Sequence, residues 1–164
     1  MRPRPTKLFA HAIAGAEFVI GLYQIAHAQS APFFGMAGVW SGGGKIDLHD
    51  GTSERIRCRA SYAVGGGGDT FHQQLRCAGD SYRFDVTSRV ESRAGSLSGN
   101  WSESTRNVSG QLSGRVTAGR IHARVDAGLF TADLTVHTNG DQQSVSIVPQ
   151  GTNIKVVAVT MRKS

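Results

Sequence analysis

The feature that most constrains the fold is an alternation of apolar and polar residues with a period of two, repeated along most of the chain. It is clear in six stretches, at 55–64, 71–77, 82–86, 108–116, 121–127 and 130–136. A period of two is typical of a β-strand that buries one face and exposes the other. The pattern predicts an all-β protein, and no amphipathic helix is expected after residue 35.

Turn signals separate these stretches at the spacing of β-hairpins, with examples at Asp50-Gly51, Ala118-Gly119 and Asn139-Gly140. Short connections join antiparallel neighbours, so we expect an up-and-down meander of about 8–10 strands. A flat sheet of that size would leave one apolar face bare and two edges open. Closure into a calycin-like barrel removes both problems, and a two-sheet β-sandwich is the alternative.

The N-terminus has the pattern of a secretory signal peptide. Basic residues precede an apolar run from Leu8 to Ala26, and Ala26-His27-Ala28 fits a cleavage site. An uncleaved membrane anchor is the rival interpretation, and Glu17 within the run counts against it. We therefore expect a periplasmic or secreted protein with a cleaved signal peptide at 1–28, an N-terminal extension at 29–36 and a single barrel domain at 37–164.

The only two cysteines, Cys58 and Cys77, stand on either side of four glycines and are symmetric about the midpoint of Gly67 and Gly68. In an exported chain an even cysteine count indicates a disulfide, and this symmetry fits a bridge across a hairpin. The spacing is far from a Cys-x-x-Cys redox site, and no paired histidines complete a zinc site. No Lys-Ser/Thr follows the glycines, so a phosphate-binding loop is not expected.

This disulfide predicts a register and, with it, an arginine surface. Pairing Cys58 with Cys77 places Arg59 opposite Arg76, and a tight turn about Gly79-Asp80 would place Arg76 opposite Arg83. Three arginines would then form a row across three strands on the outer face. Directly opposed like charges are destabilising, so the row is a candidate anion-facing surface, with solvated arginines as the plainer interpretation.

A short signal, Gly-x-Trp at the first strand (Gly38-Val39-Trp40), resembles the lipocalin or wider calycin pattern. A longer set of residues is similar to small, uncharacterised exported proteins of alphaproteobacteria. It comprises Trp40, Glu54-Arg55-Ile56-Arg57-Cys58-Arg59, Tyr62, Leu75-Arg76-Cys77, Ser81-Tyr82, Gly99-Asn100-Trp101-Ser102-Glu103, Asn107 and Gly110. The second resemblance implies export and supplies no catalytic residues.

No motif in the chain supplies catalytic chemistry. His49, His72, His122 and His137 lack metal-ligand spacing with another histidine, cysteine or carboxylate, and no Gly-x-Ser-x-Gly elbow occurs. We therefore predict no enzyme, no catalytic residue, no metal and no cofactor. A carboxylate pair at the barrel mouth is the remaining route to a hydrolytic enzyme. Nucleic-acid binding is not expected, despite a net charge of +6.

The expected function is that of a non-enzymatic binding protein, which binds its ligand or partner either inside or outside the barrel. A small apolar ligand would lie inside, while an anionic lipid headgroup or envelope protein would contact the outer arginines. The candidate interior residues are Trp40, Ile56, Tyr62, Leu75, Tyr82, Phe84, Trp101, Leu112, Phe130 and Leu134.

The alternative is an inhibitor or accessory protein that acts through its loops and N-terminal segment. With either function, we expect the mature chain to be a monomer without a transmembrane helix. The N-terminal segment runs from Gln29 to Met36 and carries Phe33 and Phe34. The two rings either plug the barrel or project toward a partner.

Overall fold

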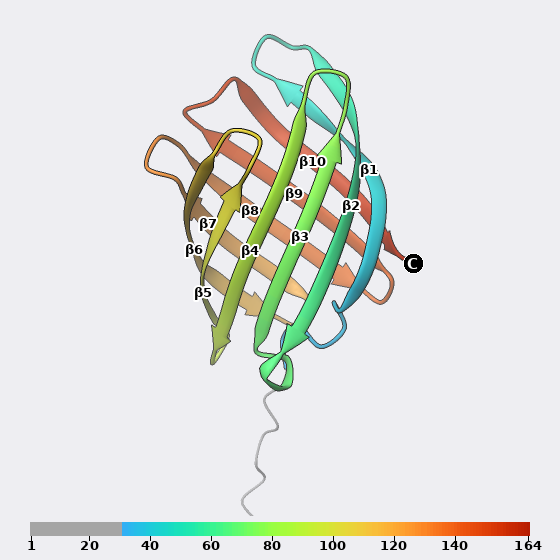
Figure 1. Ribbon diagram of the computed structural model, residues 1–164, viewed down its shortest axis with the longest axis vertical. Helices are drawn as coiled ribbons and strands as arrows, with labels where there is room; N and C mark the ends of the chain where they lie inside the picture. Colours follow the sequence, from blue (N-terminus) through green and yellow to red (C-terminus); the bar gives the residue numbers. More distant parts are fainter. Residues whose placement is uncertain (1–30) are drawn as a thin grey trace, which may run out of the picture.

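The computed structural model describes residues 31–164, and ten antiparallel strands make up most of this part of the chain (Figure 1). A single short 3-10 turn at Gly66–Gly68 connects β2 to β3. The expected signal peptide at 1–28 lies outside the described residues. The strands are β1 (Gly38–Leu48), β2 (Ser53–Gly65), β3 (Thr70–Ala78), β4 (Arg83–Arg93), β5 (Ser96–Glu103), β6 (Val108–Thr117), β7 (Arg120–Asp126), β8 (Thr131–Asn139), β9 (Gln142–Gln150) and β10 (Ile154–Lys163).

Each strand pairs with the next one in the chain, and β10 pairs with β1 to close the barrel. The prediction of an up-and-down meander closed into a barrel is therefore confirmed, and the β-sandwich alternative is wrong. Closure leaves no strand edge unpaired, which removes the aggregation risk that an open sheet of this size carries. No helix among residues 31–164 is long and apolar enough to cross a membrane.

The alternation seen in the sequence places side chains inside and outside the barrel. On β2 the residues at 56, 58, 60 and 62 are buried, while those between them are exposed. Small residues on the inner face let neighbouring strands approach closely. A Cβ added at Gly110 would collide with the Asp126 carbonyl, and one at Gly99 would collide with the Arg89 carbonyl. These two glycines allow the strong coiling that a small barrel needs.

The β2–β3 hairpin has the predicted register. Cys58 lies opposite Cys77 and Arg59 opposite Arg76. The predicted disulfide is confirmed, with a Cα–Cα distance of 4.1 Å, and both cysteines are buried on the inner face. The bridge ties β2 to β3.

The predicted register of the β3–β4 hairpin is wrong by two residues. Arg76 lies opposite Asp85, and Arg83 lies opposite Ala78. The turn is a four-residue loop over 79–82, because a Glu54 carboxylate oxygen accepts the backbone N–H groups of Ser81 at 2.8 Å and Tyr82 at 3.2 Å. A shift of two residues keeps every side chain on its predicted face but changes each cross-strand partner.

The N-terminal segment closes the lower end of the barrel in Figure 1, where the β2–β3 connection also lies. Phe33 is fully buried, and its backbone N–H donates to the Gly68 carbonyl at 3.2 Å. The Met36 carbonyl accepts the Trp40 Nε1–H at 2.8 Å. Phe34, by contrast, is 77% exposed. The plug interpretation therefore holds for Phe33, while Phe34 projects into solvent.

Candidate functional site: an interior cavity

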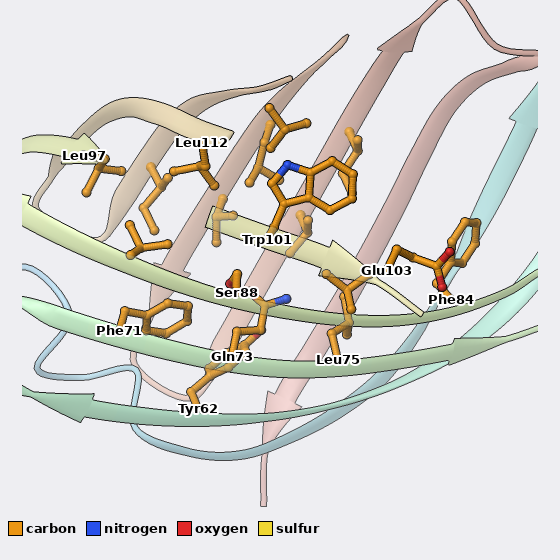
Figure 2. A pocket seen from close by; sticks show the side chains of 18 of the residues that line it. Tyr62, Phe71, Gln73, Leu75, Phe84, Ser88, Leu97, Trp101, Glu103 and Leu112 are labelled. Carbon is orange, nitrogen blue, oxygen red and sulfur yellow. The ribbon is translucent and has the colours of Figure 1, made fainter. Parts of the chain in front are cut away.

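The barrel is hollow along part of its length. A cavity of about 270 Å³ lies inside it, just below the roughly 300–1,000 Å³ typical of small-molecule sites. Figure 2 shows side chains from several strands converging on this space. Strands β2 to β10 and the N-terminal segment contribute lining residues, whereas β1 contributes none in the described part of the chain. The side chains of β1 instead pack against their neighbours, with Trp40 and Ile46 fully buried.

Seven of the ten candidate interior residues line this cavity, namely Tyr62, Leu75, Phe84, Trp101, Leu112, Phe130 and Leu134. The other three belong to the surrounding core. Trp40 and Ile56 are buried, and Tyr82 stacks on Phe84 with ring centroids 6.2 Å apart. The Tyr82 hydroxyl accepts a hydrogen bond from Asn153 Nδ2 at 3.1 Å, which links the β3–β4 and β9–β10 connections.

The lower end of the cavity is sealed by aromatic packing and a satisfied polar pair. Phe71 lies between Phe33 and Tyr62, with ring centroids 5.2 Å and 5.0 Å apart respectively. The Tyr62 hydroxyl donates to Gln143 Oε1 at 2.7 Å, and Gln143 Nε2 donates to Thr138 Oγ1 at 3.0 Å. Burial raises the pKa of Tyr62, so its hydroxyl stays protonated and remains a donor.

At the upper end, the buried Glu103 carboxylate organises the β5–β6 connection. It accepts the backbone N–H groups of Asp85 at 3.1 Å, Thr105 at 2.9 Å and Arg106 at 3.0 Å, together with the Thr105 hydroxyl. Burial acts to raise the pKa of Glu103, but these hydrogen bonds outweigh it and hold the pKa below its usual value. Glu103 is therefore an ionised, saturated acceptor, the opposite of what a general acid requires.

Arg106 covers the same end of the cavity. Its guanidinium carbon lies 4.9 Å from the centroid of the Phe84 ring. Its Nη1 donates to the Arg83 carbonyl at 2.9 Å and lies 3.5 Å from a Glu103 oxygen. This cation is already engaged with the protein on three sides.

Polar groups also occur midway along the cavity, where the sequence interpretation identified only Trp101. Gln73 lies opposite Ser88, and Ser88 lies opposite Trp101, so the three occupy neighbouring positions on β3, β4 and β5. All three line the cavity. A signal for both was present in the sequence, since Gln73 falls on the apolar face of the stretch at 71–77 and Ser88 lies two residues beyond Val86, on the same face as the stretch at 82–86.

The remaining predicted groups do not gather into a site. The four histidines are exposed, and no cluster of three or more metal-ligating side chains occurs within residues 31–164. On the outer face, Arg76 Nε lies 3.0 Å from Asp85 Oδ2, so the three arginines do not form the predicted uninterrupted row.

The fold and the cavity together define the class of protein, which is a ten-stranded, calycin-like β-barrel with a lined interior. No protein-family model matches the chain, and no curated protein matches it by sequence.

Two solved structures share the fold. Rv2717c from M. tuberculosis superposes with a TM-score of 0.63 at 14% identity, covering 79% of this chain and 93% of that one. The S-type phycobiliprotein lyase CPES from Guillardia theta superposes with a TM-score of 0.58 at 8% identity, covering 80% of this chain and 90% of that one. At these identities the likeness supports the barrel fold alone. The resemblance to alphaproteobacterial exported proteins stays a prediction.

Proposed function

We propose that this protein is an exported, non-enzymatic binding protein that holds a small apolar molecule inside its barrel. The observation that carries the proposal is the cavity of about 270 Å³ with its predominantly apolar lining. Well-packed interiors hold few voids larger than a water molecule, so a hollow of this size is unusual for a purely structural core. At about 30 Å³ per liquid water, the space suits a ligand with on the order of ten heavy atoms.

The walls of the cavity support a preformed site. Its lower end is sealed by Phe33, and its upper end is ordered by the hydrogen bonds to Glu103. A site with fixed walls binds with little ordering cost, so more of the gain from burying apolar surface appears as affinity. We expect dissociation constants between micromolar and millimolar for ligands of this size.

Two considerations support a binding role rather than catalysis. The single acidic residue lining the cavity, Glu103, has a lowered pKa and no free acceptor capacity suited to acid–base work. Its neighbour Arg106 is held by Glu103, Phe84 and a backbone carbonyl. Export is proposed from the N-terminal sequence pattern, and the disulfide is compatible with it.

Binding of an anionic lipid headgroup or envelope protein at Arg59, Arg76 and Arg83 stays a prediction. Asp85 pairs directly with Arg76 and offsets part of the positive charge on which the prediction of anion binding depends. The inhibitor role is not proposed. Phe34 and Leu129 are exposed singly at opposite ends of the barrel, and isolated exposed apolar residues are ordinary.

The proposal is tested by filling the cavity. Leu75→Trp adds bulk to a lining position, whereas Gln74→Trp adds the same bulk at the adjacent, exposed position of β3. We expect calorimetric titration with ethylbenzene to show one saturable site that Leu75→Trp weakens at least about tenfold, a loss of about 1.4 kcal/mol. Gln74→Trp should bind like the unmodified protein.

Thermal melts establish that both variants are folded before titration. The proposal is wrong if ethylbenzene and related apolar compounds show no saturable binding. It is equally wrong if Leu75→Trp and Gln74→Trp bind ethylbenzene alike.

A further inference from the structure

The cavity carries a row of three polar side chains within its apolar lining, formed by Gln73, Ser88 and Trp101. We call these three residues the polar row. They lie in direct register on β3, β4 and β5, and Figure 2 shows all three side chains on the cavity side of their strands. The rest of the lining around them is mainly aliphatic and aromatic.

Trp101 is the buried, unsatisfied member of the polar row. The Trp101 indole Nε1–H is buried and has no hydrogen-bond partner. Within residues 31–164, neither the Gln73 amide nor the Ser88 hydroxyl takes part in a side-chain hydrogen bond. Buried polar groups are nearly always paired, and an unpaired one destabilises the folded state by about 1–3 kcal/mol. The contrast with the fully paired Tyr62 and Gln143 in the same cavity is direct.

The chemistry of the row selects a hydrogen-bond acceptor. An indole N–H can only donate, while the Ser88 hydroxyl and the Gln73 amide can both donate as well as accept. The Trp101 indole nitrogen is buried, so binding of an acceptor there requires the ring to turn toward the adjoining cavity. Its ring stands 6.0 Å from that of Phe130 and lines the same space.

The charges around the cavity select a neutral ligand. The charged lining residues of the described chain are Glu103 and Arg106. Glu103 is ionised and repels an anion, whereas Arg106 is occupied by Glu103 and by the Arg83 carbonyl. A carboxylate placed inside would therefore lose its hydration without gaining a free cation.

From these contacts we propose that the polar row binds the acceptor oxygen of a small, neutral, otherwise apolar carbonyl compound, such as a ketone or an ester. This inference rests on the proposed interior binding site and names the class of ligand for it. The apolar part of the molecule occupies the surrounding lining, and the carbonyl oxygen supplies the partner that the polar row lacks.

Three probes of similar size separate the contributions. Acetophenone carries a neutral carbonyl, ethylbenzene has no acceptor, and benzoate carries a carboxylate. We expect acetophenone to bind about three- to tenfold more tightly than ethylbenzene, the gain of one neutral hydrogen bond, and benzoate to bind weakest at neutral pH. Without a partner for its oxygen, acetophenone would bind more weakly than ethylbenzene, because desolvating a carbonyl is unfavourable.

Variants and a spectroscopic signal locate the contact. Trp101→Phe keeps a ring but removes the N–H, and Gln73→Met keeps the side-chain length but removes the amide. Each should weaken acetophenone about three- to tenfold more than it weakens ethylbenzene, so the ratio of the two affinities isolates the lost hydrogen bond from the change in cavity shape. The chain has two tryptophans, so a ¹⁵N-labelled sample gives two indole signals. Acetophenone should shift the Trp101 indole proton downfield, while Trp40, already bonded to Met36, serves as the internal reference.

Thermal melts show that each variant is folded, and a similar acetophenone-to-ethylbenzene affinity ratio in the variants and the unmodified protein would overturn the inference. Equal or tighter binding of ethylbenzene, tightest binding of benzoate, or an unmoved Trp101 signal at saturation with acetophenone would overturn the inference while leaving interior binding intact. Absence of binding by all three probes would overturn the proposed function itself.

Discussion

At the scale of single residues, the buried polar groups of the barrel are of two kinds, those with hydrogen-bond partners and those without. Glu103 has acceptors filled by backbone N–H groups and a hydroxyl, and Tyr62 is paired with Gln143. Trp101 has no such partner. The satisfied groups fix the ends of the cavity, whereas the unsatisfied indole lies midway along it. This difference separates structural polar groups from those we assign to binding.

Glu103→Gln tests the structural role of the buried polar groups that have hydrogen-bond partners. The change weakens hydrogen bonds to a charged acceptor, so the free energy of unfolding at neutral pH should fall by about 1–3 kcal/mol. Because the folded pKa of Glu103 is lowered, its contribution is present above the unfolded pKa of roughly 4.3 and is lost as pH falls through the folded pKa. Urea denaturation at several pH values should show the difference from the unmodified protein shrinking below about pH 4.3.

Glu91→Gln is the matched control. Glu91 pairs with Arg93 at 3.3 Å on the exposed surface, so its loss should cost little at any pH. An unfolding difference for Glu103→Gln that stays constant from acid to neutral pH would contradict the assignment of Glu103 as an ionised acceptor.

At the scale of elements, the sequence predicted strands and faces better than it predicted cross-strand partners. Alternation determines which side chains point inward, and that depends only on the parity of residue numbers. Arg76 thus lies on the predicted outer face, yet its partner is Asp85 rather than Arg83. The loop at 79–82 depends on Glu54, which lies 27 residues before Ser81, and local turn signals carry no information about such a contact.

The same distinction applies to the candidate site. Seven interior candidates line the cavity because inner-face positions follow from periodicity. Whether the interior is hollow depends on how side chains from β2 to β10 fill the space together, and no local pattern reports that. The split between Phe33 and Phe34 is a further case, since adjacent identical residues differ only in which one meets the barrel end.

The N-terminal plug provides a prediction at this scale. Phe33→Ala removes a fully buried ring that packs on Phe71, so the free energy of unfolding should fall by about 3–5 kcal/mol. Phe34→Ala removes an identical ring that is 77% exposed, and should change it by less than about 0.5 kcal/mol. Guanidinium denaturation with the disulfide intact measures both. Similar losses for the two variants would show that the segment does not dock as described.

At the scale of the whole molecule, the barrel is uneven across its section. The side formed by β1 is packed, with Trp40 and Ile46 fully buried and outside the cavity lining. The cavity lies against the remaining strands, between the Phe33 plug and the ordered β5–β6 connection. A closed ladder, a disulfide and a packed side together supply rigidity, so the hollow side does not need to collapse to keep the barrel folded.

The central claim is that this hollow receives a ligand, and a crystal structure with 4-bromoacetophenone tests it most directly. We predict an anomalous bromine peak inside the barrel, with the carbonyl oxygen within hydrogen-bonding distance of Trp101, Ser88 or Gln73. An interior filled by repacked side chains, or bromine found only on the outer surface, would contradict the account.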